Sequence, residues 1–207
     1  DLKVALDELV LQVRPGIESG AIVLDIDDTE DRVHGHQQLS LFHAYYDERC
    51  FLPMHVYEAT TGKPVAVILR PGKTPDGAEV ALVLRHVIRA IRARWPKVDI
   101  LVRGDSHYGR HEAMTWCERN RVAYIFGLAG NKALLARVAD LAEAAALERI
   151  GGEPAAKVRR YAEFRYAAKS WTAERQVIAR VEASNRGTDS RFIVTNLRGT
   201  ARWLYEV

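Results

Sequence analysis

The chain has 207 residues, of which 48% are hydrophobic and 28% are charged. This composition excludes an intrinsically disordered chain and allows one good core with a smaller appended unit. Thirty Lys and Arg against 27 Asp and Glu leave a net charge of +3, a mildly basic balance that is compatible with a nucleic-acid partner but does not establish one. No run of about 18 uncharged apolar residues predicts a membrane span, and the first residues do not resemble a signal peptide. We therefore expect a cytoplasmic protein, whose two cysteines form neither a zinc site nor a disulfide framework.

The first part of the chain predicts one helix and then a run of strands. Apolar residues at helical spacing predict a helix over 2–13, and the short β-branched segment 21–27 predicts a buried strand. Three more strands are predicted over 39–47, 51–59 and 63–70. Short turns join these strands, so we expect them to be antiparallel.

Helices and strands then alternate. A strong amphipathic helix is predicted over 77–95, where Pro96 ends it. The following elements are predicted in the order strand, helix, strand, helix: 97–105, 110–120, 121–129 and 131–150. Beyond them, alternating apolar and charged residues predict three half-exposed antiparallel strands: 155–171, 173–184 and 189–197.

This order of elements predicts an α/β fold, in which a ribonuclease-H-like mixed sheet is flanked by helices and carries a β-rich insertion subdomain. We expect the catalytic core over 1–150, the antiparallel insertion over 151–198, and the start of a return to the core over 199–207. In such a core the first strand is central, and the strand after the first crossover helix lies beside it in parallel. Sites in open α/β sheets form at the carboxyl ends of such strands.

Acidic residues stand at the ends of both of these strands. Asp27 ends the strand in "LDIDDT", and Asp105 ends the strand in "LVRGD". Asp25 shares a face with Asp27, because side chains alternate along a strand. Two or three such carboxylates can hold divalent cations for phosphoryl transfer on a nucleic acid. Asp27 and Asp105 are therefore our candidate catalytic and metal-binding residues, with Asp25 as an alternative metal ligand.

Other readings of the same acids are open. The pattern D-x-D-x-T after an apolar strand is also typical of haloacid-dehalogenase-like phosphatases, in which Asp25 would be the nucleophile. A purely structural interpretation has the acids cap a turn or pair with Arg32 or Arg103. Asp28 and Asp31 are expected to be solvated loop residues.

Taken together, several segments resemble bacterial insertion-sequence transposases of the DDE type (DDE transposase group 1). The resemblance rests on "VLDIDDTEDRVHGHQQ", "YYDERCFLPMHVYEATTGKPVAVILRPG", "RWPKVDILVRGDSHYGRHEAMTWCERNRVAYIFGLAGNKAL" and "YAAKSWTAERQVIARVE" with "RFIVTNL". It implies a metal-dependent DNA transposase that hydrolyses and then transfers strands at transposon ends, using two magnesium or manganese ions. Asp27 and Asp105 match the first and second catalytic acids of that family.

The family's third acid is a Glu within a Tyr-Arg-Glu-type signature, which this chain does not show. Glu206 in "LYEV" lacks the residues expected after it and is not assigned. We therefore expect a fragment that is inactive alone, and a non-catalytic DNA-binding remnant is a further alternative. The implied partner is double-stranded DNA, at transposon ends and target, on which two copies of the intact enzyme pair in the nucleoid of a bacterium.

Basic residues provide candidate DNA contacts. On the predicted helix 77–95 three arginines form one stripe, which is either a solvated amphipathic face or a phosphate-binding surface. In the β-rich segment basic residues are interleaved with aromatics, as in surfaces that bind a backbone and stack bases. Trp171 is the stacking candidate there, and a packing role is the alternative. The candidates are Arg85, Arg89, Arg92, Arg159, Arg160, Lys169, Trp171 and Arg175.

Overall fold

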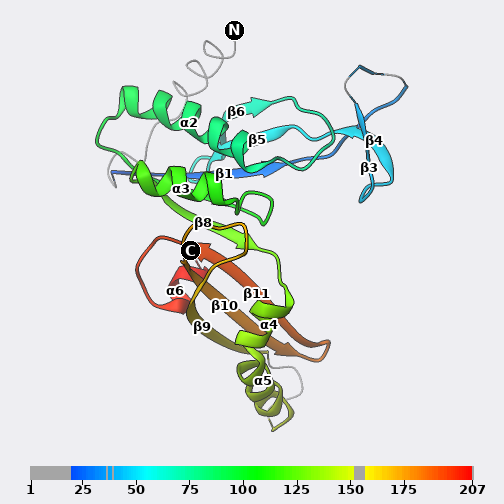
Figure 1. Cartoon of the computed structure of the whole chain (residues 1–207), viewed down its shortest axis with the longest axis vertical. Helices are drawn as coiled ribbons and strands as arrows, with labels where there is room; N and C mark the ends of the chain where they lie inside the picture. The colour runs from blue at the N-terminus through cyan, green and yellow to red at the C-terminus, as the bar shows by residue number, and fades with distance from the viewer. Residues whose placement is uncertain (1–19, 36, 39, 152–156, 207) are drawn as a thin grey trace. The chain divides into compact units, whose positions relative to one another are not determined.

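The computed structural model describes residues 20–35, 37–38, 40–151 and 157–206. The helix predicted over 2–13 lies outside these ranges. The chain divides into two compact units, Asp1–Tyr124 and Ile125–Val207, and each is described by itself. The domain boundary predicted at 150/151 falls inside the second unit and stays a prediction. The fold is a mixed α/β arrangement (Figure 1).

The first unit contains four strands of a mixed sheet, in the order β6-β5-β1-β7. Their bounds are Ala21–Asp28 for β1, Met54–Glu58 for β5, Lys63–Ile68 for β6 and Asp99–Gly104 for β7. β1 pairs with β5 antiparallel and with β7 in parallel. The predicted arrangement of the first strand beside the strand that follows the crossover helix is therefore confirmed.

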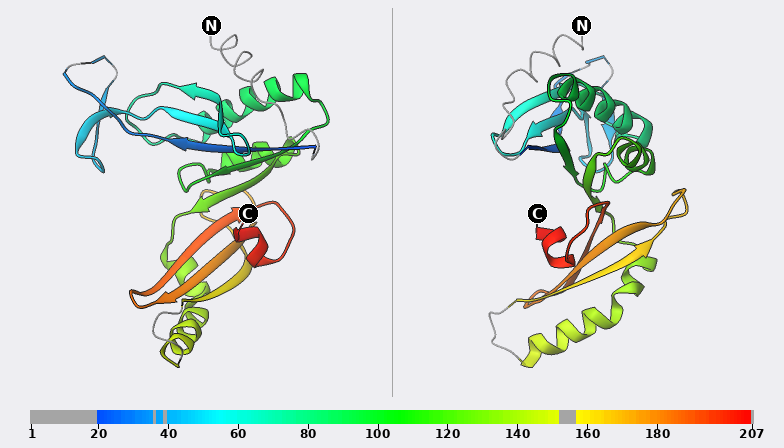
Figure 2. Two further views of the ribbon diagram at one scale, coloured as in Figure 1. Left: turned by 180° about the vertical axis from the view of Figure 1, so that it is seen from behind. Right: turned by 90° about the vertical axis from the view of Figure 1, so that its left-hand side faces the viewer.

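Two helices lie on one face of these strands (Figure 2). Helix α2 spans Gly77–Arg94, and helix α3, His111–Arg119, packs against it. The Asp76 side chain caps the N-terminus of α2 by accepting a hydrogen bond from the backbone N–H of Glu79 at 2.9 Å. Along β1 the side chains of Ile22, Leu24 and Ile26 are buried, as expected for a strand with one face in the core.

A second, three-stranded sheet lies beyond the carboxyl end of β1 (Figures 1 and 2). Its order is β2-β4-β3, with bounds Asp31–Arg32 for β2, Leu41–His43 for β3 and Glu48–Phe51 for β4. The strand predicted over 39–47 is therefore only three residues long and continues as a turn. The strand predicted over 51–59 is divided, because Pro53 separates β4 from β5.

The second unit is an antiparallel sheet in the order β8-β11-β10-β9. The strands are β8, Ala123–Leu128, which begins at the boundary between the units, β9, Val158–Tyr166, β10, Arg175–Ser184, and β11, Gly187–Thr195. The three predicted antiparallel strands of this region are thus confirmed. The helices are α4, Lys132–Arg137, α5, Ala139–Gly151, and α6, Ala201–Glu206.

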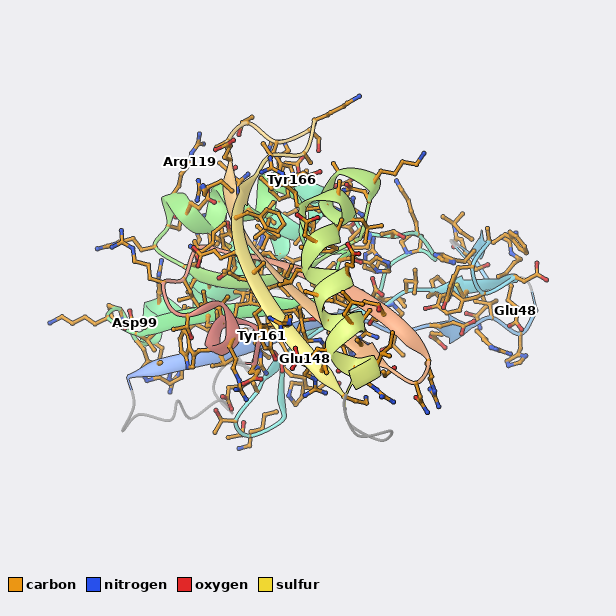
Figure 3. The ribbon with its side chains drawn as sticks, turned by 90° about the horizontal axis from the view of Figure 1, so that it is seen from below. Glu48, Asp99, Arg119, Glu148, Tyr161 and Tyr166 are labelled. Carbon is orange, nitrogen blue, oxygen red and sulfur yellow. The ribbon has the colours of Figure 1, made fainter. Side chains whose placement is uncertain are left out.

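Helices α5 and α6 cover opposite faces of this sheet. Glu148 of α5 forms an ion pair with Arg160 at 2.6 Å. The guanidinium carbon of Arg180 lies over the ring of Tyr205 of α6, 5.0 Å from the ring centroid. Arg160 and its neighbour Tyr161 point to opposite faces because they are adjacent on β9, and Tyr161 lies opposite Arg180 in the register. Figure 3 shows Glu148, Tyr161 and Tyr166 around β9.

None of the helices in the described ranges is both long and apolar enough to cross a membrane. The cysteines Cys50 and Cys117 are both buried and free.

Candidate active site

A cleft of about 530 Å³ opens in the first unit beside the carboxyl ends of β1 and β7. It brings together the two acids predicted from the sequence, Asp27 and Asp105. The other residues of its wall are Asp28, His43, Tyr45, Tyr46, Leu52, Thr74 and His107. The cleft therefore combines carboxylates with aromatic rings.

The parallel register of β1 and β7 explains why the two acids meet. Ile26 of β1 lies opposite Gly104 of β7, and each of the two acids is the next residue in its chain. Gly104 has little free space, because an added Cβ would come within 2.9 Å of the Ile26 side chain and 3.1 Å of Tyr108. A glycine before Asp105 thus lets β7 close tightly onto β1 and sets the position of that acid.

The environment of Asp27 disfavours its charged form. Partial burial raises the pKa of Asp27, and the negative charges of Asp105 and Asp28 raise it further. The backbone N–H of Asp28, which donates to Asp27 Oδ1 at 2.9 Å, opposes this shift, as does His107. A cation bound between the carboxylates would relieve this repulsion.

Asp105 is held by the residue two positions after it. The backbone N–H of His107 donates to Asp105 Oδ1 at 2.8 Å, and the His107 ring nitrogen Nδ1 lies 4.0 Å from Asp105 Oδ2. The same Nδ1 lies 3.3 Å from Asp28 Oδ2. His107 therefore connects the ends of β1 and β7.

Asp28 is not the solvated loop residue that the sequence predicted. It is the last residue of β1, and its side chain is only 5% exposed. Its position continues the buried series Ile22, Leu24 and Ile26, so strict alternation along the strand could have identified it. Next to it, Tyr108 is fully buried, and this burial together with the acidic charges raises the pKa of its hydroxyl.

Asp25 is occupied by an arginine on the neighbouring strand. Arg103 Nε donates to Asp25 Oδ1 at 2.7 Å, and Arg103 Nη2 donates to Oδ2 at 2.9 Å. The two residues are register partners, so the pair follows directly from the sheet. The structural interpretation of Asp25 as an ion-pair partner of Arg103 is thus confirmed, and Asp25 does not line the cleft.

The cleft offers an incomplete ligand set. Asp27 and Asp105 supply carboxylate oxygens of the kind that magnesium and manganese prefer, and one or two such ligands per ion suffice for magnesium. Among the described residues, however, no three or more His, Cys, Asp or Glu side chains form a group that could hold a metal ion. The two acids therefore fit a divalent cation that completes its coordination with groups from outside these residues.

The predicted DNA-contacting residues of α2 fall into two classes. Arg85 and Arg89 are exposed. Arg92 instead donates from Nη1 to the backbone carbonyl of Asn120 at 2.7 Å and from Nη2 to that of Arg121 at 3.1 Å. It thereby satisfies carbonyl groups at the end of α3.

In the second unit, most of the predicted contacts have partners within the protein. Arg159 pairs with Glu182 at 2.6 Å, and Arg160 pairs with Glu148 at 2.6 Å. Lys169 is exposed.

Trp171 packs between two neighbours. The guanidinium of Arg175, which is 4% exposed, lies 5.5 Å from the Trp171 ring centroid, and Tyr166 meets Trp171 edge-on at 5.6 Å. This geometry favours the packing role of Trp171 over base stacking.

Comparison with known proteins identifies the family. A search of curated proteins finds no match to the chain. The family model of the transposase DDE domain group 1 matches residues 6–207. Because the match covers nearly the whole chain, this protein belongs to the transposase DDE domain group 1 family.

Proposed function

We propose that this catalytic domain carries out metal-dependent phosphodiester hydrolysis and strand transfer at transposon ends, with Asp27 and Asp105 as its first two metal-binding acids. Membership in a DDE transposase family implies a polynucleotidyl transferase that acts on DNA and, as is general in the family, uses divalent metal ions. The observation that carries the residue assignment is the single cleft shared by Asp27 and Asp105, each at the carboxyl end of one of two parallel neighbouring strands.

The order β6-β5-β1-β7, antiparallel up to β1 and then parallel, supports a ribonuclease-H-like core. When bound, a pair of magnesium or manganese ions would activate the attacking oxygen and stabilise the leaving oxygen. Asp27 and Asp105 would hold these cations, and the His107 backbone N–H fixes the carboxylate of Asp105. The family's third acid is not assigned to a residue of this chain.

The phosphatase hypothesis has no support in the geometry of Asp25. Both oxygens of Asp25 accept hydrogen bonds from the Arg103 guanidinium, which makes the carboxylate less nucleophilic, and Asp25 does not line the cleft. The antiparallel strands β5 and β6 also interrupt the alternating βαβ order that this fold requires. Asp25 instead forms an ion pair with Arg103, its register partner on β7.

DNA strand cleavage tests the proposal. The transposase carrying this domain is incubated with Mg²⁺ and a duplex that contains its transposon end. We expect cleavage that Asp27→Asn and Asp105→Asn each reduce by roughly 10³-fold, since a metal centre supplies several kcal/mol of transition-state stabilisation. Asp25→Asn is the matched control on the same strand and keeps cleavage.

Two results would contradict the proposal. The absence of any cleavage by the wild-type enzyme would favour the non-catalytic DNA-binding remnant. Turnover of p-nitrophenyl phosphate that depends on Asp25 would favour the phosphatase. The same preparations, examined by sedimentation with and without DNA, test the further proposal that two copies of the enzyme pair on DNA. We also propose that the enzyme acts in the bacterial cytoplasm.

A further inference from the structure

The turn between β3 and β4 displays aromatic rings at the mouth of the acidic cleft. Tyr45 is 84% exposed, and Tyr46 is partly buried behind it. The backbone N–H of Tyr46 donates to the carbonyl of His43 at 3.1 Å, and Asp47 closes the turn with φ of 55°, a conformation that Asp tolerates better than most residues. The turn therefore has a defined backbone that presents Tyr45 outward.

These rings and the acids line the same space. His43, Tyr45 and Tyr46 form one part of the wall of the 530 Å³ cleft, and Asp27 and Asp105 form another. This volume lies within the range of about 300–1,000 Å³ that is typical of small-ligand sites. A ligand group held at the acids therefore has its neighbouring groups beside the rings.

The rings already pack on one another, and Tyr45 remains largely exposed. The Tyr45 and Tyr46 centroids are 5.0 Å apart in an edge-on arrangement, and those of His43 and Tyr46 are 4.9 Å apart. The buried Nδ1 of His43 has no hydrogen-bond partner within the described part of the chain. An outward-facing Tyr supported by a second ring is a surface on which a flat aromatic ligand can stack.

We propose that the Tyr45–Tyr46 turn stacks an unpaired nucleobase of the DNA strand whose phosphate lies at Asp27 and Asp105. The proposal rests on the proposed function, because that function brings a DNA phosphate into the cleft. In DNA, a phosphate bound at Asp27 and Asp105 is connected through one sugar to a nucleobase, which is a flat aromatic group. Its faces are available for stacking on a side chain only when the base leaves the duplex stack. Stacking on Tyr tolerates any base sequence.

The test compares DNA with and without the base. The full chain is titrated, in Mg²⁺, against a fluorescein-labelled duplex that contains one unpaired 2-aminopurine, and against the same duplex with an abasic residue at that position. We expect roughly tenfold tighter binding of the base-containing duplex and a change of 2-aminopurine fluorescence on binding. Tyr45→Ala removes both effects, and Tyr45→Phe keeps both.

Tyr57→Ala is the matched control. Tyr57 is another exposed tyrosine of the same unit, at 38% exposure, and it does not line the cleft, so its loss leaves the preference for the base intact. The inference is overturned if the two duplexes bind equally, or if Tyr45→Ala keeps the preference.

Mn²⁺ binding, measured on the same proteins by electron paramagnetic resonance, separates this inference from the proposed function. In one outcome, Tyr45→Ala keeps the preference for the base while Asp27→Asn and Asp105→Asn lose Mn²⁺ binding. That result overturns the base-stacking inference and leaves the proposed metal site standing. A Tyr45-dependent preference with Mn²⁺ binding unaffected by either Asp variant supports stacking and overturns the proposed metal site.

Discussion

Three aspartates stand close together at the end of β1, and each has a different environment. Asp25 is paired with Arg103, Asp27 lines the cleft, and Asp28 is buried beside His107. Alternation along the strand predicts the shared face of Asp25 and Asp27. It could not distinguish their partners, because Arg103 is opposite Asp25 only in the register of β1 and β7. The prediction for Asp28 is wrong because β1 extends one residue beyond the predicted end of the strand.

The Asp25–Arg103 pair contributes little to stability. Its side chains are 43% and 33% exposed, so solvent weakens the attraction. We expect Arg103→Ala to lower the free energy of unfolding by about 1 kcal/mol or less, measured by urea denaturation. A loss of several kcal/mol would mean that the pair holds the sheet together.

Glu58 makes the stability depend on pH. Burial alone would raise the pKa of this carboxyl, but hydrogen bonds from Thr61 and Thr60 outweigh burial and lower it. A lowered folded-state pKa adds stability above the unfolded-state pKa of about 4.3, and this stability is lost as the pH falls through the folded-state value. We expect Glu58→Gln to destabilise the protein by roughly 1–3 kcal/mol at pH 7.

The comparison between pH 7 and pH 3 checks this prediction. Urea denaturation should show that the difference between wild type and Glu58→Gln becomes smaller at the lower pH. A difference that does not change with pH would contradict the assignment of Glu58 as an ionised carboxylate in the folded protein.

Among the helices and strands, the sequence predicts those with strong periodicity but misses some breaks within them. The helix predicted over 77–95 agrees with α2, Gly77–Arg94. The helix predicted over 131–150 is instead divided into α4 and α5 at Val138, whose N–H bonds back to Leu135 at 3.2 Å. The Val138 side chain is buried, so we attribute the break to tertiary packing, which local helix propensity does not reveal.

An ion pair connects the segment after β6 to α2. Arg70 is 5% exposed and donates to both carboxylate oxygens of Glu79, at 2.8 and 2.7 Å. It also donates to the backbone carbonyls of Lys73 and Leu52. Glu79→Ala leaves the buried guanidinium without its counter-charge, so we expect a loss of roughly 2–4 kcal/mol in thermal or urea unfolding.

Glu48→Ala is the control for this prediction. Glu48 pairs with Arg32 at 2.9 Å, where the side chains are 40% and 58% exposed, and its removal should cost less than about 1 kcal/mol. Equal effects of the two substitutions would show that the Arg70–Glu79 pair is no stronger than an ordinary surface pair.

The net charge of +3 does not reveal which basic residues of the chain are available to DNA. Arg92 belongs to the same predicted stripe as the exposed Arg85 and Arg89, yet it is bonded to backbone carbonyls of the protein. Arg159 and Arg160 fit the pattern of basic and aromatic residues in the β-rich segment, yet both form ion pairs within the protein. Sequence patterns could not show this, since these partners lie 12 to 29 residues away in the chain.

The salt dependence of DNA binding tests the two exposed arginines of α2. If Arg85 and Arg89 bind phosphates, each Ala substitution should reduce the slope of log K against log salt concentration by about 0.9, and the double substitution by nearly 2. Fluorescence anisotropy on duplex DNA at several salt concentrations measures this slope. If the slope is unchanged, Arg85 and Arg89 do not bind phosphates and belong to a solvated face of α2.

We propose that Asp27 and Asp105 together hold the divalent cation of the active site. The most direct measurement is a crystal structure of this chain in Mn²⁺, with the ion located by anomalous scattering. We predict a peak at roughly 2.0–2.6 Å from carboxylate oxygens of both Asp27 and Asp105, and its absence in Asp105→Asn. At saturating Mn²⁺, a peak bound elsewhere, or no peak between the two acids, would contradict the assignment.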